Sequence, residues 1–158
     1  MKNRTIDQSA HAENTRVTLV IARWYPLIID ALTQSSRECL NANGVHNDSI
    51  NAVYVPGAFE IPLAVAAIAE RGETDAIITL GVVIRGQTPH FDYVCQTCAD
   101  GVQSLAIKHR LPISLGVLTV ENAQQAWDRT NGTHGNKGHE AVLAALEMVN
   151  VLRALDHG

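Results

Sequence analysis

Residues 81–94 read Gly-Val-Val-Ile-Arg-Gly-Gln-Thr-Pro-His-Phe-Asp-Tyr-Val, the most informative segment of the chain. It begins inside an apolar run, residues 75–84, that is typical of a buried strand. A polar loop, residues 85–89, follows, and a helix is expected to begin at His90. In an open α/β sheet, the amides between a strand end and a helix N-terminus bind anions. The stretch therefore predicts an anion site with a histidine, a proton carrier, at its mouth.

The alternation of strand and helix extends over the rest of the chain. Apolar runs predict strands, and apolar residues at helical spacing, bounded by proline or glycine, predict helices. Strands are expected over residues 17–22, 50–55, 75–84 and 112–120, and helices over residues 27–43, 60–70, 90–108, 121–130 and 140–155. Uniformly apolar strands favour a parallel sheet covered on both faces. We therefore predict an α/β fold, a three-layer α/β/α sandwich around a four-stranded parallel sheet, of the flavodoxin-like type.

Length and composition narrow the class of protein. The 158 residues suit a single domain, which we place at residues 16–158 after a flexible, polar arm of residues 1–15. The net charge of −4 and the absence of a basic block argue against nucleic acid as a partner. No apolar run is long enough to span a membrane and no signal peptide is recognisable, so we expect no membrane partner and a cytoplasmic location.

The cysteines predict neither a redox centre nor a metal site. Cys95 and Cys98 form a Cys-x-x-Cys pattern, but a redox pair lies at a helix N-terminus, and the expected helix begins earlier, near His90. Cys98 also lies on an apolar stripe at helical spacing with Val94 and Val102, which favours packing in the core. No second pair of ligands stands at zinc spacing, so no metal is expected.

Loops that follow parallel strands meet at one edge of the sheet, where ligands gather in such folds. These loops carry most of six segments that, in this order, resemble the lumazine synthases. The segments are residues 22–24 (Ala-Arg-Trp), 55–62 (Val-Pro-Gly-Ala-Phe-Glu-Ile-Pro), 81–94, 116–119 (Gly-Val-Leu-Thr), 125–129 (Gln-Ala-Trp-Asp-Arg) and 135–138 (Gly-Asn-Lys-Gly). The resemblance covers about residues 16–155.

The resemblance implies a condensation that uses no cofactor. The amine of 5-amino-6-ribitylaminopyrimidinedione attacks 3,4-dihydroxy-2-butanone 4-phosphate, phosphate and water leave, and 6,7-dimethyl-8-ribityllumazine forms. This is the penultimate step of riboflavin biosynthesis, and the enzyme is a transferase. The chemistry requires orientation, a proton shuttle and a phosphate clamp.

The resemblance also implies which residues form the site. His90 is similar to the family's proton-transfer histidine, and Gln87 and Thr88 are similar to its phosphate-binding turn. Arg129 and Lys137 are similar to residues that bind the phosphate, a task for which the guanidinium fork is suited. The other expected substrate contacts are Trp24, which stacks on the ring, Ala58, Phe59 and Glu60 on the ribityl chain, and Val82, Val83, Ile84 and Leu115 around the ring.

Several of these residues also have a purely structural interpretation. On sequence alone, His90 could be a solvated histidine at a helix start, Arg129 a solvated arginine at a helix end, and Glu60 a first-turn glutamate favoured by the helix dipole. Trp24 could cap a strand end. Their position within the matching segments favours the functional interpretation.

Departures from the family pattern bear on substrate affinity. Leu115 stands where many members have a phenylalanine contributed by the neighbouring subunit, and Tyr25 stands where an asparagine is common. Trp24 replaces the usual phenylalanine and offers a larger face for stacking on a lumazine or flavin ring. Riboflavin is therefore a candidate ligand.

The family resemblance further implies self-association into pentamers with active sites shared between neighbours. Pairing of pentamers into decamers and closure into icosahedral shells are both open, and riboflavin synthase is a candidate partner. One alternative function is a flavin-binding or storage protein on the same scaffold, with weak synthase activity. Another is a phosphate-binding regulator of the receiver type, which is disfavoured because no predicted strand ends in an acidic residue.

Overall fold

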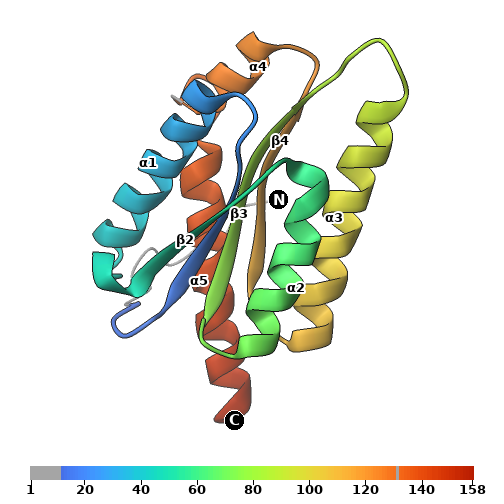
Figure 1. Ribbon diagram of the computed structural model, residues 1–158. Coiled ribbons are helices and arrows are strands. Elements are labelled where there is room, and N and C mark those ends of the chain that lie inside the picture. Colours follow the sequence, from blue (N-terminus) through green and yellow to red (C-terminus); the bar gives the residue numbers. More distant parts are fainter. Residues whose placement is uncertain (1–11, 131) are drawn as a thin grey trace, which may run out of the picture.

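The computed structural model describes residues 12–130 and 132–158 as one sheet with helices on both faces (Figure 1). Its elements, in chain order, are β1 (Val17–Ala22), α1 (Pro26–Ala42), η1 (Asn47–Ser49), β2 (Ile50–Val55), η2 (Ala58–Glu60), α2 (Ile61–Arg71), β3 (Ala76–Ile84), α3 (His90–His109), β4 (Ile113–Val120), α4 (Ala123–Asp128) and α5 (Lys137–Asp156). The four strands are parallel in the order β2-β1-β3-β4. The predicted fold class is confirmed.

The strands begin nearly in register, which brings their carboxyl ends to one edge of the sheet. Val17 of β1 pairs with Ile50 of β2 and with Ala76 of β3, and Ile77 of β3 pairs with Ile113 of β4. Every residue of β1 is buried, because this strand lies between two others and under helices on both faces. Its sequence is apolar except for Thr18, whose buried hydroxyl donates to the Thr74 hydroxyl at 3.1 Å.

Each face of the sheet packs against a different set of helices, as Figure 1 shows. One core cluster joins odd-numbered residues of β1, such as Leu19 and Ile21, to α1 and α5. The other joins Val20 and Ala22 to α2 and α3. Alternate side chains of a strand point to opposite faces, so a single apolar strand fills both cores.

A glycine lies at a tight contact within each pair of helices. A Cβ atom on Gly138 of α5 would lie 2.9 Å from the carbonyl oxygen of Leu32 on α1, and one on Gly101 of α3 would lie 2.7 Å from two ring carbons of Pro62 on α2. Both distances are shorter than van der Waals contact. The absence of a side chain at these positions therefore allows the two helices on each face of the sheet to pack closely against each other.

The element boundaries differ from the sequence prediction chiefly at the last helix. We expected α5 to begin at Glu140, but it begins at Lys137, because the Asn136 side chain accepts a hydrogen bond from the His139 amide at 3.2 Å and caps the helix. The short turns η1 and η2 were not predicted. Residues 1–11 of the proposed arm, and residue 131, lie outside the described residues. Ala12 is buried, and its amide donates to the Asn43 carbonyl at 3.2 Å.

Across the described residues, every helix is too short or too polar to span a bilayer.

The amino ends of β1 and β3 are joined by a bidentate ion pair between Arg16 and Asp75. The Asp75 carboxylate accepts from the Arg16 backbone amide at 2.7 Å, from Nε at 3.1 Å and from Nη2 at 3.0 Å. Partial burial raises the pKa of Asp75, but the hydrogen bonds and charge of Arg16 outweigh this effect, so the pKa lies below its ordinary value.

We predict that Asp75→Asn lowers the free energy of unfolding at pH 7 by about 1 kcal/mol. A lowered pKa in the folded state stabilises the protein above the unfolded-state pKa, about 4, and this stabilisation is lost as the pH falls through the folded-state value. The difference between variant and wild type should therefore shrink below about pH 4. Urea unfolding at pH 7 and pH 3 measures it, and a difference independent of pH would contradict the assignment.

Candidate active site

The strand order reverses between β1 and β3, and this is where an open α/β sheet forms its ligand crevice. A cavity of about 560 Å³ opens at the carboxyl ends of β1, β2 and β3. We call it the aromatic cavity. It is lined by Trp24, Tyr25, Gly57, Ala58, Phe59, Glu60, Val82, Val83, Ile84, His90 and Val94.

Two loops supply the aromatic wall of this cavity. Trp24 and Tyr25 follow β1, and the two side chains are 64% and 39% exposed. Tyr25 has a left-handed backbone, with φ of 61°, and its carbonyl accepts from the amides of Ile28 and Ile29 at the start of α1. Phe59 of η2 is 57% exposed. Large apolar side chains are thus held in the open around one cavity, as a binding site for a planar ring requires.

Gly57 connects the aromatic and polar sides of the cavity. A Cβ atom at this position would lie 3.2 Å from Cδ1 of Trp24 and 3.3 Å from Oε2 of Glu60. The indole and the Glu60 carboxylate therefore both pack against the bare Gly57 backbone. A ring stacked on Trp24 would have a carboxylate close by to accept hydrogen bonds from hydroxyl groups.

His90 is the first residue of α3, is exposed, and lines the same cavity. The loop before it is open as well. Gly86, Gln87 and Thr88 are exposed, and a Cβ atom on Gly86 would meet nothing within 4 Å. The described residues offer no hydrogen-bond acceptor to the amides of this loop. These amides lie next to a helix N-terminus and are available to an anion.

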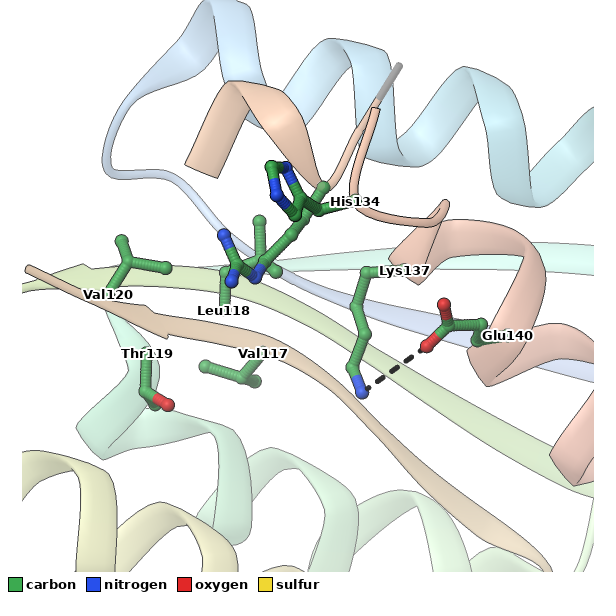
Figure 2. Close-up of a pocket in the computed structure, with 8 residues that line it drawn as sticks. Val117, Leu118, Thr119, Val120, His134, Lys137 and Glu140 are labelled. Carbon is green, nitrogen blue, oxygen red and sulfur yellow. Dashed lines mark ion pairs between the residues drawn. The ribbon is translucent and has the colours of Figure 1, made fainter. Parts of the chain in front are cut away.

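Arg129 and Lys137 line a second, smaller cavity of about 220 Å³, which we call the basic cavity (Figure 2). It lies beside β4, between that strand, the end of α4 and the start of α5. Its lining consists of Val117, Leu118, Thr119, Val120, Arg129, His134, Lys137 and Glu140. Lys137 Nζ lies 3.9 Å from Glu140 Oε2, the pair marked in Figure 2. Arg129 Nη1 donates to the Gln125 carbonyl at 2.9 Å, and no carboxylate of the described residues pairs with Arg129.

The structure divides the residues that the sequence proposed for the site into separate groups. The aromatic cavity brings together Trp24, Ala58, Phe59, Glu60, Val82, Val83, Ile84 and His90. Gln87 and Thr88 lie in the exposed loop before His90, and Arg129 and Lys137 in the basic cavity. Leu115 lies on the edge strand β4, is 37% exposed, and lines neither cavity. Within one chain, Arg129 and the amides of residues 86–88 therefore share no cavity.

Sequence reasoning did not assign Gly57, Val94, His134 or Glu140 to a site. Gly57 and Val94 stand inside the segments that resemble the family, so each could have been found there. His134 and Glu140 flank the segment with Lys137, but nothing in their spacing marks them. Only the fold of the chain between α4 and α5 places them next to Arg129.

Cys98 packs in the core, as the helical spacing predicts, and its thiol is free. Burial raises its pKa to about 11, which makes the thiol a poor nucleophile near neutral pH. Within residues 12–130 and 132–158, no group of three or more His, Cys, Asp or Glu side chains is placed to hold a metal ion.

Comparison with known proteins identifies the family of this chain. Residues 14–153 match the sequence profile described as 6,7-dimethyl-8-ribityllumazine synthase. The enzyme of that name from Xanthomonas campestris pv. campestris (strain B100) is 45% identical over 140 residues, which cover 89% of this chain and 91% of the relative. The one from Edwardsiella ictaluri (strain 93-146) is 44% identical over 153 residues, 96% of this chain and 98% of the relative. The chain therefore belongs to the 6,7-dimethyl-8-ribityllumazine synthase family.

Proposed function

We propose that this protein condenses 5-amino-6-ribitylaminopyrimidinedione with 3,4-dihydroxy-2-butanone 4-phosphate to give 6,7-dimethyl-8-ribityllumazine. The observation that carries the proposal is the aromatic cavity. It places a stacking wall, a carboxylate and a histidine around one space at the switch point of the sheet. Family membership and the small-molecule nature of both substrates agree with a cavity of this size.

In the proposed mechanism, the pyrimidine ring stacks on Trp24 and its ribityl hydroxyls bind near Glu60. The free amine attacks the ketone carbon of the butanone, and loss of water gives an imine. Elimination of phosphate follows, and the second amine closes the ring with loss of another water. His90 accepts and returns the protons that these steps move. Alignment of the two substrates supplies much of the acceleration, since bound reactants react as if at very high concentration.

We infer that the phosphate binds at the amides of residues 86–88 of one copy and at Arg129 of a neighbouring copy, with Lys137 and Leu115 on that same neighbour. Arg129 has no carboxylate partner among the described residues, and Leu115 lies on an exposed edge strand. Both residues are free to complete a site on another chain. A pentamer is the proposed assembly. Association with riboflavin synthase and a cytoplasmic location are further parts of the proposal.

The test is an assay with both purified substrates that follows lumazine and inorganic phosphate together. The mechanism requires one phosphate released for each lumazine formed, and omission of either substrate should stop both signals. Phosphate release in the absence of the pyrimidine, or no product above the uncatalysed rate, would contradict the proposed function.

Flavin binding is a second activity that one observation favours. Trp24, a larger ring than the family's usual phenylalanine, is 64% exposed in the aromatic cavity beside Phe59. An isoalloxazine ring presents the same kind of flat face as the lumazine product. We therefore propose that riboflavin occupies the ring site in competition with the pyrimidine.

We predict that riboflavin quenches the fluorescence of Trp24. Trp127 is partly buried against the core and lines neither cavity, so its emission should persist. Trp24→Phe should weaken the binding of riboflavin by about 1 kcal/mol, which is a roughly fivefold rise in Kd, and should retain turnover. Trp24→Ala should abolish the quenching. Equal riboflavin affinity in wild type and Trp24→Ala, measured by equilibrium dialysis, would remove the indole from the ring site.

A further inference from the structure

Arg85 follows β3 directly and precedes the open loop 86–88. We propose that Arg85 is a positioning residue, which fixes the phosphate-binding loop and His90 relative to each other by tying the end of β4 to the first turn of α3. The proposal deepens the proposed function of this site and rests on it. Arg85 itself lines neither the aromatic nor the basic cavity.

The contacts of Arg85 reach β4, the turn after β4, and α3. Its backbone amide donates to the carbonyl of Val120, the last residue of β4, at 2.9 Å. Its Nε lies 3.1 Å and 3.0 Å from the two carboxylate oxygens of Glu121, which follows β4. Its Nη1 lies 3.3 Å and 3.4 Å from those of Asp92 on α3. The guanidinium therefore bridges two carboxylates on elements far apart in the sequence.

The same guanidinium also packs against Phe91. Its Cζ atom lies 4.2 Å from the centre of that ring. Phe91 and Asp92 are the two residues after His90, so both contacts act on the turn that carries the imidazole. Stacking fixes the plane of the guanidinium, and the two carboxylates fix its direction within that plane.

The loop lacks restraints of its own. Residues 86–88 are exposed and have no hydrogen bonds from their amides within the described part of the chain. Their position depends on what holds the two ends of the loop. One end is Arg85 on the sheet, and the other is the start of α3, where the Asp92 amide donates to the Pro89 carbonyl at 3.0 Å. The Arg85 side chain joins these ends across the loop.

Arg85 could act on phosphate binding through its charge or through positioning, and an experiment can separate these two roles. Asp92 and Glu121 place two negative charges near the loop, and Arg85 compensates one of them. If Arg85 acted only through charge, removal of a carboxylate should strengthen phosphate binding. If Arg85 acts by positioning, removal of Glu121 should weaken it, because the bridge from β4 to α3 is broken.

The test compares Arg85→Lys and Glu121→Ala with wild type in the full-length protein. Lysine retains the charge but cannot reach two carboxylates with a planar fork. Arg110→Lys is the matched control, since Arg110 pairs with Asp156 at 3.2 Å and lines neither cavity. The measurements are the KM of each substrate, the Kd of inorganic phosphate, riboflavin quenching and the thermal midpoint.

For Arg85→Lys we expect the KM of the butanone phosphate and the Kd of inorganic phosphate to rise about tenfold. The KM of the pyrimidine and the riboflavin affinity should stay within about twofold, because the ring wall stands on other elements. Glu121→Ala should raise the Kd of inorganic phosphate in the same way. Arg110→Lys should leave the KM of each substrate and the Kd of phosphate unchanged.

Tighter phosphate binding in Glu121→Ala would overturn the proposal, as would unchanged phosphate affinity in Arg85→Lys. Equal loss for both substrates, together with a lowered thermal midpoint, would also overturn it by showing a general structural role. These measurements test the proposed function and the role of Arg85 separately. A wild-type protein that binds phosphate but forms no lumazine contradicts the proposed function, whereas the phosphate affinities of the variants still test Arg85.

Discussion

Replacement of His90 by alanine should lower the turnover number by about 10²-fold, which is the usual contribution of a positioned general acid–base group. The imidazole lines the aromatic cavity and stands at the start of α3 beside the open loop. Because the side chain is exposed, its removal creates no cavity in the core, and the assembly should stay intact. Steady-state kinetics with both substrates saturating measure the effect.

His46→Ala is the matched control for this experiment. His46 is also exposed, but it precedes β2, at the opposite edge of the sheet from the aromatic cavity. Its variant should turn over like wild type. Unchanged kinetics in a folded His90→Ala protein would remove this histidine from the mechanism, and the alignment of substrates would then account for the acceleration alone.

With the butanone phosphate kept well below its KM for Arg129→Ala, both His90→Ala and Arg129→Ala should show low activity, and mixed assemblies of the two should regain activity if the site is shared between copies. His90→Ala lacks the proton carrier, and Arg129→Ala lacks the proposed phosphate ligand and should lose affinity mainly for the butanone phosphate. In a ring with head-to-tail interfaces and random mixing, about a quarter of the sites would combine His90 of one copy with Arg129 of the next. At this limiting concentration, co-expression should therefore raise the rate from near background to about a quarter of the wild-type value.

The control for the mixing experiment is the double variant His90→Ala/Arg129→Ala. Co-expressed with His90→Ala, it offers no intact histidine and should stay inactive. If the first mixture assembles but also stays inactive, Arg129 does not complete the site of a neighbour. Equal loss of affinity for both substrates in Arg129→Ala would instead indicate a structural role in the basic cavity.

Most of the fold follows from local sequence signals. Continuous apolar runs mark the strands, and the predicted helix over residues 60–70 ends within one residue of α2, where Gly72 adopts a left-handed conformation after Arg71. The aromatic cavity is predictable for the same reason. It is built from loops that follow β1, β2 and β3, and parallel strands bring such loops together whatever the details of packing.

The parts of the site that the sequence did not predict depend on contacts between distant segments of the chain. Arg85 is the first residue of the predicted loop, but its proposed role depends on contacts with Glu121, which follows β4, and with Asp92 of α3. Arg129 and His90 both stand near carboxyl ends of strands, yet they line different cavities, since β4 is an edge strand and α4 packs beside it. Periodicity in the sequence assigns helices and strands, but it does not show which side chains from distant segments line the same cavity.

At Tyr25, a strained backbone conformation and a place in the lining of the aromatic cavity belong to the same residue. A side chain other than glycine or asparagine in this conformation costs on the order of 1 kcal/mol or more. The chain tolerates that cost while the phenol borders the aromatic cavity and the carbonyl holds the start of α1. Selection for stability alone would favour asparagine at position 25. This substitution would replace the phenol in the cavity lining with an amide. Engineering for thermal stability would therefore favour asparagine at position 25, whereas engineering for flavin binding would favour tyrosine.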